Sequence, residues 1–316
     1  MDDLVADLNG ATVFSMVNLH SGYHQLMLQP SSRYITTFST HVGLYRYKRL
    51  SFRINSAAEV FQHTIQSVLD GNKGVRNVSD DIIIFGKDQQ EHDAALDQTL
   101  KQLHRSGLTI NLKKCEFNKT ELEFFGYVFS KDGIAPDPKK VQAVQDAKEP
   151  QNPSEVRSFL GMAQYSSRFL NGFATMTEPL RKLTKHDVKW SWDKPQADAF
   201  QAIKDNLAKS ASTAFFDPRK QSELLVDGSP VGVAAILAQD SRPIVYASRA
   251  LREVEQWYSQ TEREALAVVW ACEHFHVFLA GAPVRVLTDH KPLIGIWKIR
   301  EPASPNCQVG TTSSAV

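Results

Sequence analysis

Two adjacent aspartates, Asp80 and Asp81, constrain this chain more than any other feature of its sequence. They lie in the stretch RNVSDDIIIFG, residues 76–86, directly before four β-prone apolar residues at 82–85. This pattern predicts a β-hairpin whose turn carries the two acids. Acids at a turn are ordinarily solvated turn residues. Here the apolar residues on both sides predict partial burial, where a divalent cation would neutralise two like charges. A Mg²⁺ site is therefore the chemical alternative.

The composition is that of a soluble globular chain and excludes several classes of protein. Of the 316 residues 42% are apolar and 22% are charged, and the formal net charge is +1. No overall basic excess marks a nucleic-acid binder, so any such surface must be local. No apolar stretch approaches the roughly 18–20 residues of a membrane helix, and the start MDDLVADLNG is acidic, unlike a signal peptide. We expect no membrane partner and no secretion.

The cysteines give a second indication of the compartment. Cys115, Cys272 and Cys307 are widely spaced and form no C-x-x-C pair. This argues against a disulfide framework or a structural zinc site. Reduced thiols fit an intracellular location, cytoplasmic or nuclear. The sequence gives no indication of the oligomeric state.

Helical and strand-like segments alternate along the first part of the chain, which predicts an α+β fold. The segment SAAEVFQHTIQSVL, residues 56–69, has apolar residues at helical spacing. A second helix is predicted over residues 91–107, ending at Gly107. Residues 108–117 and 121–130 predict two further strands.

The proline-marked stretch APDPKK, residues 135–140, begins a different organisation. A small helical module follows, in which Asn152, Pro153 and Glu155 form the start of a capped helix. Strand patterns return from residue 222, and one long helix is predicted over residues 261–279. We expect boundaries that give a first part at 1–136, a helical module at 137–185, a connection at 186–220, a second folded part at 221–299 and a tail at 300–316 that does not fold.

A series of motifs follows in one order along the chain. These are FSMVNLHSGYHQ, FRINSAAEVFQ, VSDDIII, LKKCEF, FFGYVFSKDGIAPDP and SFLGMAQYSSRF, followed by VDGS, TEREALAVV and VLTDHKPL. In their order and spacing they resemble the polymerase and ribonuclease H region of gypsy-type LTR retrotransposon Pol polyproteins, over residues 2–297. The resemblance implies a reverse transcriptase fingers and palm fragment, a helical thumb, a connection and an incomplete ribonuclease H-like α/β domain.

The family's activities are RNA-directed DNA synthesis and hydrolysis of RNA in RNA–DNA hybrids. Both would use two Mg²⁺ ions per active site, or Mn²⁺, in phosphoryl transfer. The implied partners are an RNA template, a DNA primer, an RNA–DNA hybrid and deoxynucleotide triphosphates. The implied polymerase residues are Asp80 and Asp81 as metal-binding catalytic acids, Tyr23 and Phe52 as nucleotide-binding residues, and Phe125 and Gly126 as the hairpin that grips the primer terminus.

The chain departs from the family pattern at the catalytic centre of the palm. The family has a further catalytic Asp where this chain has Asn18. A neutral amide is a poor bridge between two cations, so we expect polymerisation to be lost. The family also usually has Gly and Pro where this chain has Arg53 and Ala58, and we expect Arg53 to obstruct the nucleotide. The family's fingers strands would precede residue 2.

Three further acids match the family's ribonuclease H metal ligands. Asp227 ends a predicted strand, Glu264 lies on the long helix and Asp289 ends a later strand. Taken singly, they are explained as a turn residue, a solvated helix acid and a strand-end cap. Only their joint match indicates a metal site. The family's fourth acid would fall in the segment expected not to fold, so we expect hydrolysis to be impaired.

Three hypotheses follow from these observations. The chain is an active polymerase and nuclease, or a catalytically dead remnant that binds nucleic acid, or a relic with no cellular role. Salt-sensitive binding without turnover would favour the second over the first. Cooperative unfolding would count against the third.

Overall fold

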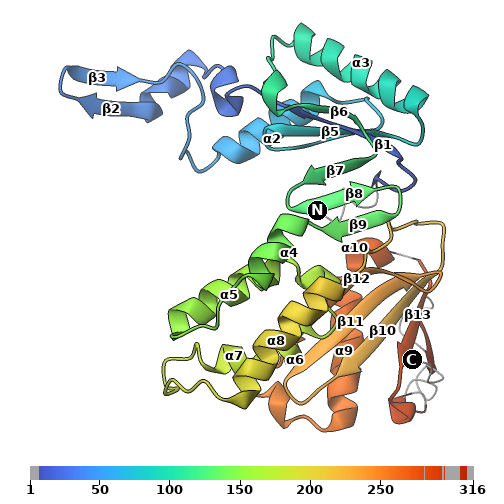
Figure 1. Cartoon of the computed structure of the whole chain (residues 1–316). Helices are drawn as coiled ribbons and strands as arrows, with labels where there is room; N and C mark the ends of the chain where they lie inside the picture. The colour runs from blue at the N-terminus through green and yellow to red at the C-terminus, as the bar shows by residue number, and fades with distance from the viewer. Residues whose placement is uncertain (1–6, 281, 294, 296–306, 312–316) are drawn as a thin grey trace. The chain divides into compact units, whose positions relative to one another are not determined.

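The structure, a computed structural model, describes residues 7–280, 282–293, 295 and 307–311 (Figure 1). Residues 7–122 form one compact unit, and the described residues from 123 onward form another. Within these ranges no helix is long and apolar enough to cross a membrane.

The first unit is built on a four-stranded sheet in the order β4-β5-β1-β6. Its strands are β1 (Val13–Asn18), β4 (Val75–Val78), β5 (Asp81–Gly86) and β6 (Glu116–Lys119). The hairpin predicted around the paired aspartates is confirmed, since β4 and β5 are antiparallel and Val78 pairs with Asp81. The apolar run of β5, a central strand, is fully buried, and Ile82, Ile83 and Ile84 are 0% exposed.

Two helices pack against this sheet, α2 (Ala57–Val68) and α3 (Gln89–Arg105). Phe61 and Ile65 of α2 and Leu103 of α3 share one core with Ile82 and Ile84. Both helices were predicted. The helix α3 ends as expected, because Gly107 has a φ of +69° and follows the last helical turn.

The predicted strand over residues 108–117 is wrong for most of its length. Residues 112–114 form a short 3₁₀ helix, and the strand β6 begins only at Glu116. The chain turns here because the Asn111 N–H donates to the Asn18 carbonyl at 2.8 Å, which ties this segment to the end of β1.

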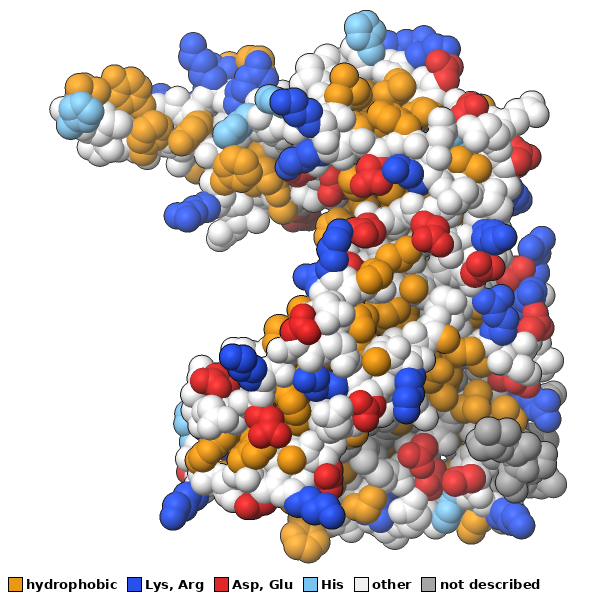
Figure 2. Space-filling model, viewed as in Figure 1, with side chains coloured by type: hydrophobic (Ala, Val, Ile, Leu, Met, Phe, Trp, Pro, Cys, Tyr) orange, Lys and Arg blue, Asp and Glu red, His pale blue; other side chains and the backbone are white. Residues whose placement is uncertain are grey.

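A two-stranded ribbon projects from the sheet within the first unit (Figure 1). It consists of a 3₁₀ helix, Pro30–Thr36, and the strands β2 (Thr37–Thr40) and β3 (Gly43–Arg46). Hydrophobic, basic and histidine side chains lie together along it (Figure 2). Its large exposed apolar residues are Tyr34, Ile35, Phe38, Val42, Leu44, Tyr45 and Tyr47.

A three-stranded sheet, which belongs to the second unit except for the first two residues of β7, consists of β7 (Glu121–Phe124), β8 (Tyr127–Ser130) and β9 (Gly133–Pro136). The prediction of one strand over residues 121–130 is therefore wrong, because two strands lie there. Phe125 and Gly126 have φ values of +49° and +70° and turn the chain between β7 and β8. The hairpin implied by the family resemblance is the arrangement found.

Five helices follow: α4 (Pro138–Gln145), α5 (Pro153–Tyr165), α6 (Phe173–Met176), α7 (Glu178–Lys182) and α8 (Lys194–Lys209). They enclose a common core that includes Phe159 and Phe200. The predicted cap of α5 is confirmed, because the Glu155 N–H donates to Asn152 Oδ1 at 3.0 Å and Pro153 is the first helical residue.

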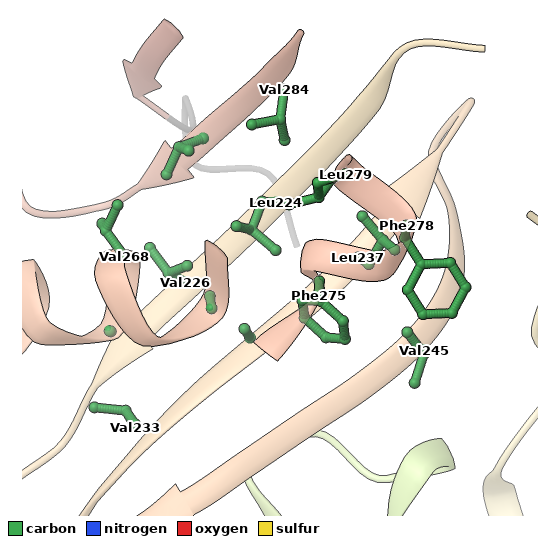
Figure 3. Packing of buried hydrophobic residues seen from close by; sticks show 14 of the residues in the cluster. Leu224, Val226, Val233, Leu237, Val245, Val268, Phe275, Phe278, Leu279 and Val284 are labelled. Carbon is green, nitrogen blue, oxygen red and sulfur yellow. The ribbon is translucent and has the colours of Figure 1, made fainter. Parts of the chain in front are cut away.

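The last part of the second unit is a mixed sheet in the order β12-β11-β10-β13-β14. Its strands are β10 (Ser222–Gly228), β11 (Gly232–Gln239), β12 (Arg242–Ala250), β13 (Val284–Thr288) and β14 (Cys307–Thr311). β10 pairs antiparallel with β11 and parallel with β13. Leu224, Val226 and Leu237 of the sheet pack against Phe275 and Phe278 (Figure 3).

Two expectations for this part differ from the structure. The single helix over 261–279 is divided at Phe275 into α9 (Gln260–His274) and α10 (His276–Leu279). The break lets both Phe275 and Phe278 enter the core, where they are 2% and 8% exposed. The segment 300–316, expected not to fold, contains the strand β14, which pairs in parallel with β13.

Candidate functional sites

Two adjacent strands bring the predicted polymerase residues of the first unit together. In the antiparallel pairing of β1 with β5, Asn18 lies directly opposite Asp81. Ser79, at a φ of +56°, and Asp80 form the hairpin turn, and the Leu19 N–H donates to the Asp80 carbonyl at 2.8 Å. The three side chains at 18, 80 and 81 are half-buried.

The Asn18 side chain is hydrogen-bonded to one of the two acids. Its Nδ2 donates to Asp81 Oδ1 at 2.6 Å. A carboxylate only accepts hydrogen bonds, so the amide must turn its NH₂ group, and not its oxygen, toward Asp81. The positive end of the amide dipole therefore lies beside Asp81 Oδ1, at the position that a bound cation would need to occupy. This donor set does not fit the two-ion site that the family resemblance implies.

The absence of a side chain at Gly22 leaves room for the Asp80 carboxyl. A Cβ on Gly22 would lie 2.9 Å from Asp80 Cγ, closer than real Cβ contacts, so a side chain at position 22 would displace the acid. Ser79 Oγ also donates to Asp80 Oδ1 at 2.9 Å. The sequence interpretation missed Gly22, because the contact depends on the fold and not on spacing.

The two residues predicted to contact the nucleotide lie together. The rings of Tyr23 and Phe52 are 5.3 Å apart in an edge-to-face arrangement, and Phe61 lies 5.0 Å from Tyr23 on its buried side. Phe52 is 56% exposed. The pair therefore presents one aromatic ring to solvent.

Arg53 has a backbone conformation that favours Gly, the residue that the family resemblance implies at this position. Its φ is +67°, in the left-handed region that costs a residue with a Cβ roughly 1–2 kcal/mol and costs Gly almost nothing. The sequence interpretation assigned the departure to obstruction of a nucleotide. The structure adds backbone strain as a second and independent consequence.

We expect the Arg53→Gly variant to be more stable by about 0.5–1 kcal/mol, since the relieved strain exceeds the extra chain entropy of Gly. Urea unfolding would measure it. Arg53→Ala is the matched control, because it removes the same side chain and keeps the Cβ. An equal gain from both variants would show that the side chain, and not the backbone, is the source.

The three predicted nuclease acids lie near the C-terminal ends of two neighbouring strands in the second unit and on the helix α9. Asp227 is the penultimate residue of β10, and Asp289 directly follows β13, its parallel neighbour. Glu264 lies on α9. This helix packs closely against β10 at Gly228, where an added Cβ would lie only 3.0 Å from the Glu264 nitrogen. Asp227 and Asp289 also line a cavity of about 230 Å³.

Glu264 is a buried carboxyl with one satisfied oxygen. It is 2% exposed, and its Oε1 accepts from Gln260 Nε2 at 2.7 Å, while the buried Oε2 has no hydrogen-bond partner. Burial raises the pKa of Glu264, the hydrogen bond from Gln260 partly offsets this, and the charges of Asp227 and Asp289 raise the pKa further. Partial burial, followed by the charge of Asp289, likewise raises the pKa of Asp227.

These features fit a divalent cation. Mg²⁺ prefers carboxylate oxygens, and a buried, unpaired carboxylate oxygen among like charges is costly unless a cation or a proton satisfies it. Among the described residues no three His, Cys, Asp or Glu side chains already converge as a metal cage. The acids repel one another electrostatically, and a bound ion would draw them together.

A local basic segment was also missed by the sequence interpretation. Residues 8–58 contain no Asp or Glu but five Lys and Arg residues, although the whole chain is nearly neutral. Four of the five lie in or beside the ribbon: Arg33, Arg46, Lys48 and Arg49. A count of acids in windows along the sequence would have found this segment.

Comparison with protein families gives two matches. Residues 2–129 match the reverse transcriptase (RNA-dependent DNA polymerase) family, and residues 192–286 match the RNase H-like domain found in reverse transcriptase. The first range includes the palm residues and the β7–β8 turn. The second includes Asp227 and Glu264 and ends just before Asp289. Proteins of these families generally use divalent metal ions.

Similar proteins are found among retrotransposons. The chain is 35% identical over 305 residues to the retrovirus-related Pol polyprotein from transposon gypsy of Drosophila melanogaster, covering 92% of this chain and 30% of the relative. It is 32% identical over 304 residues to the transposon Tf2-3 polyprotein of Schizosaccharomyces pombe, covering 93% of this chain and 23% of the relative. The chain thus spans less than a third of either relative.

Solved structures show the same fold. The foamy viral protease-reverse transcriptase in complex with an RNA/DNA hybrid superposes with a TM-score of 0.85 at 18% identity, covering 100% of this chain and 46% of that one. The same viral protein in complex with dsDNA gives 0.83 at 19% identity, covering 96% and 68%. The predicted α+β class, with a palm and a ribonuclease H-like domain, is confirmed.

Proposed function

Because this chain belongs to the reverse transcriptase and RNase H-like region of retrotransposon Pol polyproteins, we propose that it binds RNA–DNA hybrids and hydrolyses their RNA strand, while DNA synthesis is disabled at Asn18. The observation that carries the proposal is the unpaired, buried Oε2 of Glu264 beside Asp227 and Asp289. Like-charged acids at the junction of two parallel strands and a helix are what a metal-dependent phosphodiesterase needs.

The roles of the chain's own residues follow from their contacts. Asp227, Glu264 and Asp289 would hold Mg²⁺ or Mn²⁺, two ions in the full family arrangement, and the bound metal would supply an activated water and neutralise the scissile phosphate. Gln260 orients Glu264 through Oε1, which leaves Oε2 for the ion. Gly228 lets α9 approach β10 closely enough for Glu264 to reach the sheet edge.

For polymerisation we propose binding without turnover. Tyr23 and Phe52 would contact a deoxynucleotide triphosphate, and Phe125 and Gly126 a DNA primer on an RNA template. Asp80 and Asp81 would bind a cation weakly, since Asn18 provides no third charge. No catalytic step is assigned to this site.

The proposal is tested with the purified chain, Mg²⁺ or Mn²⁺, nucleotides and a hybrid labelled on both strands. We expect RNA cleavage that EDTA abolishes and that falls at least about 1,000-fold in Asp227→Asn, with no extension of the DNA strand. Cleavage that persists in Asp227→Asn would show that a contaminating nuclease produces it. Extension by the wild-type chain would contradict the assigned role of Asn18.

A second candidate function is binding of nucleic acid without hydrolysis. The acid-free segment 8–58, with its basic residues and exposed aromatic rings, favours it. Binding whose affinity falls steeply with salt, together with no cleavage in either metal, would select this candidate over the nuclease.

A further inference from the structure

The turn between β7 and β8 is held in a conformation that one of its two residues, Phe125, does not favour. Phe125 and Gly126 are both left-handed, with φ values of +49° and +70°. Gly accepts this conformation, but it is unfavourable for Phe by roughly 1–2 kcal/mol. Phe125 is also 43% exposed, so burial of its side chain does not compensate. Contacts from outside the turn must stabilise it.

Tyr165, the last residue of α5, makes these contacts within the second unit. Its hydroxyl donates a hydrogen bond to the Phe125 carbonyl. Its ring stacks on that of Tyr127 with the centroids 5.5 Å apart and the planes at 18°. A Cβ on Gly126 would lie 2.6 Å from the Tyr165 ring, so the glycine is what lets the ring close over the turn. One side chain therefore contacts three consecutive residues of the hairpin.

The surroundings keep the Tyr165 hydroxyl a hydrogen-bond donor and add positive charge. Burial raises the pKa of Tyr165, with smaller contributions from Tyr127 and Asp137, so the hydroxyl is protonated at neutral pH. Lys140 Nζ lies 5.2 Å from the Tyr165 ring centroid, and Arg168 lies 5.4 Å from that of Tyr127. Lys140 is exposed, so its ammonium is available to a phosphate.

We propose that Tyr165 is a positioning residue for nucleic-acid binding. It fixes the Phe125–Gly126 turn in the conformation that contacts the sugar-phosphate backbone at a recessed DNA 3′ end, and Lys140 adds a phosphate contact beside it. This inference rests on the proposed primer contact of Phe125 and Gly126. It assigns to the helical module a part in holding the duplex end, through a residue outside both groups of acids.

The test compares two ligands by fluorescence anisotropy: an RNA–DNA hybrid with a recessed DNA 3′ end, and a blunt hybrid of equal length. We expect Tyr165→Phe, which keeps the ring and loses the hydroxyl, to bind the recessed hybrid about 3- to 10-fold more weakly. Tyr165→Ala, which also loses the stack, should bind it about 10- to 100-fold more weakly. Affinity for the blunt hybrid should change less than about 2-fold, which a general loss of folding would not give.

The salt dependence separates the two kinds of residue. Lys140→Gln should reduce the slope of log affinity against log salt by about 0.9, as expected for one lost phosphate contact, whereas Tyr165→Phe should leave the slope unchanged. Tyr258→Phe, at another partly exposed tyrosine of the second unit, is the control and should bind as the wild type. Unchanged binding of the recessed hybrid by Tyr165→Ala, or equal losses on both ligands, would overturn the inference. Failure of the wild type to bind either hybrid would instead overturn the proposed function, and this inference with it.

Discussion

Replacing Asn18 with Asp is expected to make the chain a DNA polymerase that depends on divalent metal. The register of β1 and β5 puts position 18 directly opposite Asp81. A carboxylate at position 18 would therefore join Asp80 and Asp81 as a third acid of the cation site. A lost metal-bridging charge is worth several kcal/mol in the transition state, so we expect primer extension by Asn18→Asp at least about 100-fold above the wild-type level. Extension in the Asn18→Asp/Asp80→Ala double variant should fall back to that level.

In the absence of metal, the same substitution should lower the stability of the protein. Asp at position 18 loses the 2.6 Å hydrogen bond to Asp81 and adds a like charge beside it. A hydrogen bond to a charged group contributes about 1.5–3 kcal/mol, so we expect metal-free Asn18→Asp to unfold more easily by at least this amount. Saturating Mg²⁺ or Mn²⁺ should restore the loss, because binding to the folded state alone stabilises it.

The control for this prediction is Asn206→Asp, at an exposed asparagine of α8. It introduces the same charge away from both groups of acids. A negative charge in the last turn of α8 should cost about 1 kcal/mol of stability at most, and the metal dependence of the stability should not change. Calorimetric unfolding in EDTA and in metal would be compared in an Asp227→Asn background, which removes the second metal site. Equal metal responses of the wild type and Asn18→Asp would show that position 18 does not face a cation.

How much of the fold could be predicted from the sequence depends on the range of the interactions that determine each element. The hairpin at Asp80 and the cap of α5 at Asn152 were predicted because residues within a few positions determine them. The helix break at Phe275 and the wrong strand over 108–117 were not, because a distant core and the end of β1 determine them. Local patterns carry no information about such partners.

The candidate sites show the same limit more sharply. The family resemblance named Asn18, Asp80 and Asp81, but only the strand register shows that the amide donates to Asp81. The positions of Gly22 and Tyr165 matter through contacts with Asp80 and Phe125, which lie far away in the sequence. The charge of the segment 8–58, by contrast, is a property of the sequence itself and needed only to be counted.

The Glu264→Gln variant is expected to separate the stability of the nuclease site from its activity. The substitution keeps the shape of the side chain and its contact with Gln260, and removes a charge that is buried with one unpaired oxygen. RNA cleavage should fall at least about 1,000-fold, because a metal ligand is lost. The metal-free variant should nevertheless be more stable than the wild type at pH 7, by roughly 1–2 kcal/mol.

The pH dependence identifies Glu264 as the origin of that difference. A carboxyl whose pKa is raised on folding binds more protons in the folded state than in the unfolded state around its titration range. Its contribution is therefore fully present below the unfolded pKa of about 4.5 and is lost as the pH rises through the folded pKa. The stability gain of Glu264→Gln should be small near pH 4, grow as the pH rises and reach its full size above the folded pKa of Glu264.

A neighbouring acid on the same helix supplies a control with the opposite sign. Glu262 is exposed and accepts a hydrogen bond from the Ser259 N–H at 2.7 Å, the contact that chiefly holds its pKa below the usual value. Its contribution is present above the unfolded pKa and is lost as the pH falls through the folded pKa, so Glu262→Gln should lose stability at neutral pH and converge with the wild type in acid. Unfolding of both variants in EDTA from pH 4 to 8 would show these opposite trends. If Glu264→Gln followed Glu262→Gln instead, the buried oxygen would already have a partner in the folded protein, and the metal site inferred from it would fall.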